Sequence, residues 1–302
     1  MDSRGATYVL TIGLWSERIL ALAFVLLVSA LCLSASAPAG LPDVTVRAAP
    51  SLQGPGHPGY DVSWPQCSRR DGGYGLPKPR DDARFVIIGL TRGRPFTVNP
   101  CLTEQVDHAW MRDLPAHAYT IPAYPTPTQL RRIGDRGPWR TNTEASRLRN
   151  SGYAQATFAL HTMAAVGFRP PMVWLDVEHL DRQPWPRDTA AERVANRQVL
   201  LGMMRGFADA GIAFGLYSYP RGWQEITDGW QVAEVPVWAT AGRSTRSAAQ
   251  DRCREPSFSG GPVFLAQWYD SVRDSNITCD RFTLVPPVTR VPTPVGVPAE
   301  SR

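Results

Sequence analysis

The sequence predicts an α/β protein whose strands form a mainly parallel sheet. Between residues 58 and 284, short apolar runs alternate with segments of helical periodicity, which is the pattern of repeated strand–helix units. No internal repeat is visible. Such alternation fits either a closed barrel or an open, doubly wound sheet, and both remain open on this evidence.

Seven short runs are expected to form strands. Each is rich in apolar, β-branched or aromatic residues and is bounded by Gly, Pro or polar residues, as buried strands are. They span residues 59–64, 85–90, 117–123, 171–178, 213–219, 235–239 and 263–268.

Three longer segments are expected to form helices. Asn99 precedes a proline and predicts a helix start there. Apolar residues at helical spacing predict a second helix over 149–166. Thr189 and Glu192 match a capping box that opens the third. Residues 122–139 are expected to be loop, because prolines are frequent there.

The two ends of the chain differ in composition from its middle. Residues 1–37 hold an apolar run followed by Ala-Ser-Ala, the layout of a secretory signal peptide or, if uncleaved, of a membrane anchor. Residues 38–57 are expected to be a linker and 285–302 a Pro-rich disordered tail. Residues 58–284 then form a single domain. We expect this domain to lie outside the cytoplasm, either secreted or anchored at the cell surface.

Composition and motifs exclude several classes of function. The 302-residue chain has a formal net charge of +5 but no block of five or six basic residues, so nothing indicates nucleic-acid binding. Histidine spacings typical of zinc hydrolases, P-loops and dinucleotide fingerprints are absent. We expect a monomer without a cofactor or metal. A basic exported domain would adhere to anionic cell-wall polymers.

Four cysteines lie in the part of the chain expected to be exported: Cys67, Cys101, Cys253 and Cys279. They allow three pairings. The local pairing, Cys67 with Cys101 and Cys253 with Cys279, is favoured because each pair brackets one predicted strand and its loop. The close spacing that a cysteine metal site requires is absent.

Residues 171–178 (PMVWLDVE) end a buried strand in two acids. In a strand, Asp176 and Glu178 share one face, roughly 6–7 Å apart at Cα. Burial and mutual repulsion raise at least one of the two pKa values, and glycoside hydrolysis needs one protonated acid beside an ionised one. Asp61 lies in the first predicted strand and Asp274 follows the last. A barrel would bring all four acids to one mouth.

Other interpretations of these acids remain open. Asp176 and Glu178 are alternatively strand-end acids paired with arginines, since arginine is abundant. Asp61 and Asp274 are alternatively turn formers. Four carboxylates are also a ligand set for Ca²⁺.

Several of these segments resemble motifs of the family 25 glycoside hydrolases, the lysozyme-type muramidases. Residues 59–66 (GYDVSWPQ) resemble the opening motif, 176–178 the D-x-E pair and 274–276 the closing D-x-N. Three further matches fall in later strands, at 215–218, 237–239 and 267–269. The chain also resembles a group of secreted actinobacterial proteins of unknown function that share this opening motif.

The resemblance implies a TIM-like (β/α) barrel, with irregular or missing helices in the C-terminal half. It implies retaining, substrate-assisted cleavage of a β-1,4 bond in peptidoglycan or a related amino-sugar glycan. Glu178 would be the general acid and then the base, Asp176 would orient the sugar's acetamido group, and Asp61 and Asp274 would set the charge state of that pair. The aromatic side chains expected to bind substrate are Tyr119, Tyr217, Trp238 and Trp268, with Trp238 alternatively a residue of the core.

The chain departs from the family pattern at three points. Arg92 stands where these muramidases usually have a glutamate, Thr120 follows Tyr119 where they usually have a histidine, and the aromatic residue expected shortly after Trp238 is missing. Two alternatives to an active enzyme therefore remain: a catalytically inactive barrel that binds cell-wall glycan, and a wall-associated scaffold.

Overall fold

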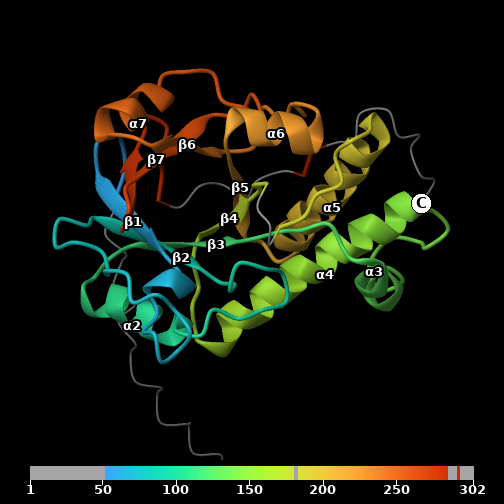
Figure 1. Cartoon of the computed structure of the whole chain (residues 1–302), viewed down its shortest axis with the longest axis horizontal. Helices are drawn as coiled ribbons and strands as arrows, with labels where there is room; N and C mark the ends of the chain where they lie inside the picture. The colour runs from blue at the N-terminus through green and yellow to red at the C-terminus, as the bar shows by residue number, and fades with distance from the viewer. Residues whose placement is uncertain (1–51, 180–182, 285–290, 293–302) are drawn as a thin grey trace, which may run out of the picture. The chain divides into compact units, whose positions relative to one another are not determined.

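The computed structural model describes residues 52–179, 183–284 and 291–292. Eight strands, β1 to β8, close into a barrel in chain order (Figure 1). Neighbouring strands from β1 to β7 run parallel, whereas β8 is antiparallel to both β7 and β1. The predicted barrel is confirmed and the doubly wound alternative is wrong. The predicted signal or anchor segment, most of the linker and nearly all of the tail lie outside the described residues.

The strands are short and nearly uniform in length. They are β1 (Pro58–Val62), β2 (Phe85–Gly89), β3 (Ala116–Thr120), β4 (Met172–Asp176), β5 (Ala213–Ser218), β6 (Val237–Arg243), β7 (Val263–Tyr269) and β8 (Asp274–Thr278). The sequence predicted the first seven and missed β8, because that strand has few apolar residues and looks like a polar loop.

Helices cover the outside of the barrel (Figure 1). They are α2 (Leu102–Met111), α3 (Pro127–Ile133), α4 (Glu144–Ala165), α5 (Ala190–Asp209), α6 (Pro220–Thr227) and α7 (Arg246–Arg252), with a 3-10 turn at η1 (Trp64–Gln66). The two helices after β5 and β6 are short, and residues 270–273, between β7 and β8, form no helix. The expected irregular C-terminal half is therefore confirmed.

Helix α3 occupies part of the segment predicted as loop. Thr126 caps it by accepting a hydrogen bond from the backbone N–H of Gln129 at 3.2 Å, and the Gln129 side chain accepts from the Thr126 N–H at 2.8 Å. Pro127 at the first helical position is favourable. The loop prediction is wrong for residues 127–133, because frequent prolines do not exclude a helix whose first turn holds the proline.

Two other helix starts differ from their predictions. Helix α4 begins at Glu144, because Thr143 caps it by accepting from the Ser146 N–H at 3.1 Å. Asn99 lies just before α2, and its side-chain oxygen accepts from the Cys101 N–H, so that Cys101 takes the capping position. The predicted capping box of α5 is confirmed.

Large side chains fill the barrel interior below the mouth. Phe85, Ile87, Met172 and Trp174 are each at most 2% exposed and pack in one cluster. Gly215 makes room for this packing, because a Cβ at that position would lie 2.3 Å from the Trp174 ring. A second and larger apolar layer fills the space between the barrel and its helices.

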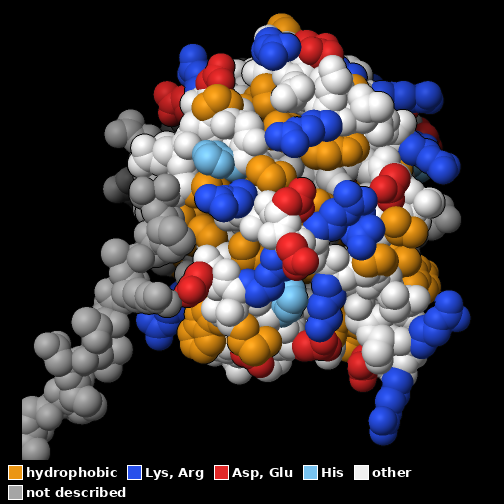
Figure 2. Space-filling model, turned by 90° about the vertical axis from the view of Figure 1, so that its left-hand side faces the viewer, with side chains coloured by type: hydrophobic (Ala, Val, Ile, Leu, Met, Phe, Trp, Pro, Cys, Tyr) orange, Lys and Arg blue, Asp and Glu red, His pale blue; other side chains and the backbone are white. Residues whose placement is uncertain are grey.

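Both predicted disulfides are present. Cys67 pairs with Cys101 and Cys253 with Cys279, which confirms the local pairing. Among the described residues, none of the helices has the length and apolar character needed to cross a membrane. On the face drawn in Figure 2, basic and acidic side chains are interspersed.

Helices α4 and α5 pack with their backbones in contact at two glycines. A Cβ on Gly152 would lie 1.9 Å from the carbonyl oxygen of Val199, and a Cβ on Gly202 would lie equally close to the carbonyl oxygen of Arg149. Neither obstacle is a flexible side chain, so a larger residue forces the helices apart.

We expect Gly152→Ala to lower the free energy of unfolding by about 1–3 kcal/mol, despite the roughly 1 kcal/mol that alanine gains over glycine in a helix. Urea unfolding measures the difference. His161→Ala, at an exposed position on the same helix, is the control and should stay within about 0.5 kcal/mol of wild type. An unchanged midpoint for Gly152→Ala would refute the close packing.

Candidate active site

Four carboxyl groups meet at the mouth formed by the C-terminal ends of the parallel strands. Asp61 lies near the end of β1, Asp176 ends β4, and Glu178 follows two residues later. Asp274 begins β8, directly opposite Asp61 in the antiparallel pair. Two expectations are corrected here: Glu178 lies beyond its strand rather than in it, and Asp274 opens a strand rather than following the last one.

Asp61 is held by two side-chain amides inside the barrel. Its Oδ2 accepts from Gln267 Nε2 at 3.0 Å and from Asn276 Nδ2 at 2.7 Å. Tyr217 in turn donates to Gln267 Oε1 at 2.8 Å, and the Trp238 indole N–H donates to Asn276 Oδ1 at 2.8 Å. Because an indole can only donate, the Asn276 amide is fixed with its NH₂ toward Asp61. A proton on Asp61 therefore belongs on Oδ1.

This network changes the role expected for two aromatic residues. Trp238 is 2% exposed and Tyr217 is 6% exposed, so neither offers a free ring face on which a sugar could stack. Their polar atoms instead orient the amides that hold Asp61. The expected stacking of sugars on these two rings therefore gains no support from the structure.

The other two predicted aromatic residues lie in different places. Tyr119 is partly buried at the end of β3, with its ring centroid 6.1 Å from that of Trp238 and edge-on to it. Trp268 lies on the opposite face of β7 from Gln267 and packs with Ala266 in the layer outside the barrel. The structure therefore does not bring Trp268 to the site.

Burial raises the pKa of all four carboxyl groups. It raises the pKa of Asp61 to about 8, with the charge of Asp274 adding to the effect. It raises the pKa of Asp176 well above its usual range, with Glu178 the next cause. Burial and then Asp274 raise the pKa of Glu178 to about 7, and burial and then Asp270 raise that of Asp274 to about 6. Near neutral pH the cluster therefore holds protons that ordinary carboxyls would have lost.

One oxygen of Asp176 has no hydrogen-bond partner. Within the described part of the chain, Oδ1 of this 7%-exposed residue is buried and unpaired. A buried acceptor without a donor is costly, and a ligand N–H placed there would remove that cost. No group of three or more His, Cys, Asp or Glu in the described ranges is arranged to hold a metal ion, so the Ca²⁺ alternative gains no support.

Three polar residues of this site were not among the predicted site residues. Gln267 and Asn276 fall inside the resembling motifs, and an amide at an inward position of a buried strand is a signal that could have identified them. Gln183 was missed entirely, although its buried amide bonds to the backbone at Asp176 and Glu178. Nothing in the local sequence around Gln183 distinguishes it from a loop glutamine.

We expect Asp274→Asn to lower the pKa of Glu178, because the charge of Asp274 is the second cause of its elevation. Removing that charge makes ionised Glu178 less unfavourable, so less of it is protonated at pH 7. NMR titration of ¹³C-labelled glutamate measures the shift. Glu234→Gln, at an exposed position, is the control with the same change in net charge. An unchanged Glu178 titration in Asp274→Asn would contradict the coupling.

The comparison with protein families gives one match. The family model described as Lys-1, lysozyme-like protein 1, matches residues 142–253. This segment is lysozyme-like in sequence. It holds Asp176 and Glu178 but ends before Asp274 and begins after Asp61. The resemblance to lysozyme-type proteins is thereby confirmed for the middle of the chain. A search of curated proteins finds no match.

Solved structures with a similar course of the chain include muramidases and lysozymes. The muramidase of Trichobolus zukalii is 18% identical, with 73% of this chain and 92% of that one covered and a TM-score of 0.46. The lysozyme of Streptomyces coelicolor is 16% identical, with 73% and 91% covered and a TM-score of 0.47. The family GH25 lysozyme of Aspergillus fumigatus is 14% identical, with 73% and 92% covered and a TM-score of 0.45.

Proposed function

We propose that this lysozyme-like chain is a glycoside hydrolase that cleaves peptidoglycan or a related cell-wall amino-sugar glycan with retention of configuration. The observation that carries the proposal is the buried carboxyl cluster, in which a Glu178 of raised pKa lies beside an Asp176 with an unpaired oxygen. The lysozyme-like match of the segment that holds both residues supports the choice of substrate.

Glu178 is the proposed general acid. A carboxyl with a pKa of about 7 is substantially protonated at neutral pH, and it can protonate the leaving glycosidic oxygen as the bond to the anomeric carbon breaks. Once ionised, the same group accepts a proton from the water that attacks in the second step. An acid with an ordinary pKa would have lost its proton at pH 7 and could not begin this cycle.

Asp176 is proposed to hold the substrate's acetamido group. Its unpaired Oδ1 can accept the acetamido N–H, which turns the acetamido oxygen toward the anomeric carbon of the same sugar. That oxygen forms the new bond as the leaving oxygen departs, and water later replaces it from the side that the leaving group occupied. Two displacements at one carbon give net retention.

Asp61 and Asp274 are proposed to set the charge of the pair. The charges of both raise the pKa of Asp176, and the charge of Asp274 raises that of Glu178. The amides of Gln267 and Asn276 fix Asp61 so that its field acts from a constant position. The two disulfides support action outside the reducing cytoplasm.

The proposal is tested with purified peptidoglycan in its N-acetylated form and after chemical N-deacetylation, using residues 38–302. We expect reducing ends to be released from the first and at least roughly 100-fold more slowly from the second, because the acetamido nucleophile is missing. Equal release from both would reject participation of the acetamido group. No release from either, with the protein still sedimenting with the wall, would replace the hydrolase with a glycan-binding barrel.

A further inference from the structure

Gln183 has a fully buried side chain that hydrogen-bonds to the backbone of both residues of the proposed catalytic pair. Its Nε2 donates to the carbonyl oxygen of Asp176 at 2.7 Å and to that of Pro122 at 2.5 Å, and its Oε1 accepts from the Glu178 N–H at 2.9 Å. Because carbonyls only accept and an N–H only donates, the orientation of this amide is fixed. Gln183 thus ties the end of β4 to the segment that follows β3.

Strand β5 holds the same backbone from the other side. The Val177 N–H donates to the Tyr217 carbonyl oxygen at 2.9 Å, and the Ser218 hydroxyl donates to the Val177 carbonyl oxygen at 2.7 Å. Together with the glutamine, these bonds pair all four polar groups of the two peptide units between Asp176 and Glu178. Rotation of either peptide unit breaks at least one buried hydrogen bond.

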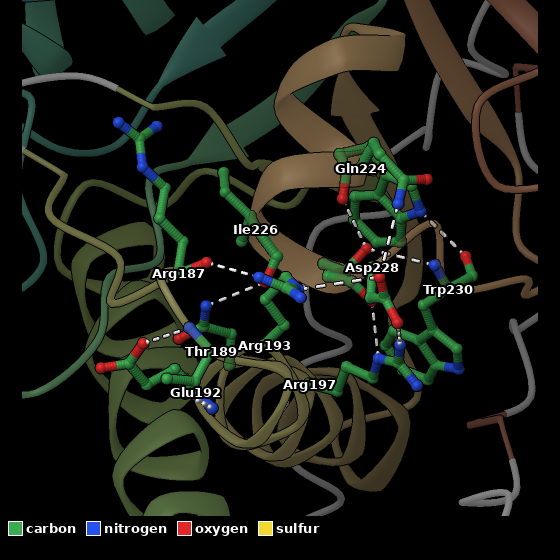
Figure 3. A network of polar contacts seen from close by, with 12 residues as sticks. Arg187, Thr189, Glu192, Arg193, Arg197, Gln224, Ile226, Asp228 and Trp230 are labelled. Atoms are coloured by element: carbon green, nitrogen blue, oxygen red, sulfur yellow. Dashed lines mark hydrogen bonds and ion pairs between the residues drawn. The ribbon is translucent and has the colours of Figure 1, made fainter.

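The segment after Gln183 is hydrogen-bonded to side chains of α5, one of which also bonds to the end of α6 (Figure 3). Asn196 Nδ2 donates to the carbonyl oxygens of Pro186 at 2.6 Å and of Ile226 at 2.8 Å. Arg193 donates to the carbonyl oxygen of Arg187 at 2.6 Å. These contacts join the segment to α5 and to the end of α6. The backbone that carries Gln183 is therefore anchored independently of β4.

We propose that Gln183 is a positioning residue, which fixes the directions in which Asp176 and Glu178 project into the barrel mouth. Glu178 lies beyond the last ladder residue of β4, so the sheet alone does not set its direction. The glutamine supplies the missing constraint through the Glu178 N–H. Its effect on turnover rests on the glycosidase function proposed above, whereas its effect on the geometry of Glu178 does not.

The test compares Gln183→Met with Gln155→Met. Gln155 is also buried, and its side-chain amide hydrogen-bonds to both the N–H and the carbonyl oxygen of Ala123. No described hydrogen bond joins Gln155 to residues 176–178. We expect Gln183→Met to lower kcat on peptidoglycan by roughly 10–100-fold, because small misplacements of catalytic groups have large effects, with KM within about threefold. Gln155→Met, matched in chemistry, should change kcat by less than about threefold.

A second measurement on the same variants does not depend on turnover. ¹³C-glutamate titration should give a Glu178 pKa of about 7 in wild type and a value nearer the ordinary ~4.3 in Gln183→Met, because the freed residue turns toward solvent. Gln155→Met should titrate as wild type does. If this pKa shift appears while the wild type releases no product from peptidoglycan, the positioning role of Gln183 is supported and the proposed glycosidase function is rejected.

The proposal is overturned if Gln183→Met and Gln155→Met match in both kcat and the Glu178 titration. Circular dichroism and thermal unfolding show whether each variant is folded. If Gln183→Met does not fold, Gln183→Glu and Gln155→Glu replace the pair. Gln183→Glu keeps the acceptor for the Glu178 N–H but, when ionised, loses both donors, so the same contrast in kcat with its control is expected.

Discussion

Glu178→Gln is expected to lower kcat on peptidoglycan by roughly 10²–10⁴-fold, the usual contribution of a general acid. Glutamine matches the glutamate in shape but cannot release a proton to the leaving oxygen. Binding to the wall should be unchanged, because the neutral amide resembles the protonated acid. Reducing-end release measures turnover, and sedimentation with insoluble wall measures binding.

Glu234→Gln is the matched control for this variant, since it makes the same change at an exposed position. It should keep wild-type turnover. Equal activity of Glu178→Gln and wild type would remove Glu178 from the reaction. A parallel loss of wall binding and turnover would indicate that Glu178 binds the glycan rather than protonates it.

Asp176→Asn is expected to lose activity and gain stability. Turnover should fall roughly 10²–10³-fold, the range for removal of a preorganised electrostatic group, because asparagine cannot stabilise the charge that develops on the acetamido group. Stability should change in the opposite direction, because the aspartate is buried with an unpaired oxygen among other carboxyls.

The pH dependence of this stability difference follows from the direction of the pKa shift. A carboxyl whose pKa is raised on folding binds more protons in the folded state than in the unfolded one. Its contribution to the free energy of unfolding therefore falls as the pH rises above its pKa in the unfolded chain, which is near 4. Asp176→Asn should therefore melt above wild type at pH 8, with the gap narrowing toward pH 5. Thermal unfolding across this range measures the gap, and a constant gap would contradict the raised pKa.

Much of the fold was predictable because the spacing of apolar residues that marks a strand or a helix is visible within a short stretch of sequence. The runs at 85–90 and 171–178 were identifiable as buried strands from composition alone. The last strand was not, because β8 (Asp274–Thr278) is stabilised by its register against β1 and β7 rather than by apolar residues of its own. Closure of the barrel by an antiparallel strand is a tertiary property.

The four acids of the site were predictable as a set, because each lies at or near an end of a strand, where barrels gather such residues. The direction of neighbouring side chains was not. Gln267 and Trp268 are adjacent, and a shift of one residue exchanges the inside and outside of a strand. The sequence favoured the tryptophan as a sugar platform, whereas the structure places the glutamine inward, against Asp61.

The most direct test of the central claim is a proton NMR time course with soluble, N-acetylated peptidoglycan fragments. It follows the anomeric signals of the first product before mutarotation. Wild type is expected to release the β anomer first, because the acetamido oxygen and then water attack the same carbon in turn. Release of the α anomer first, or no new anomeric signal at all, would contradict the account.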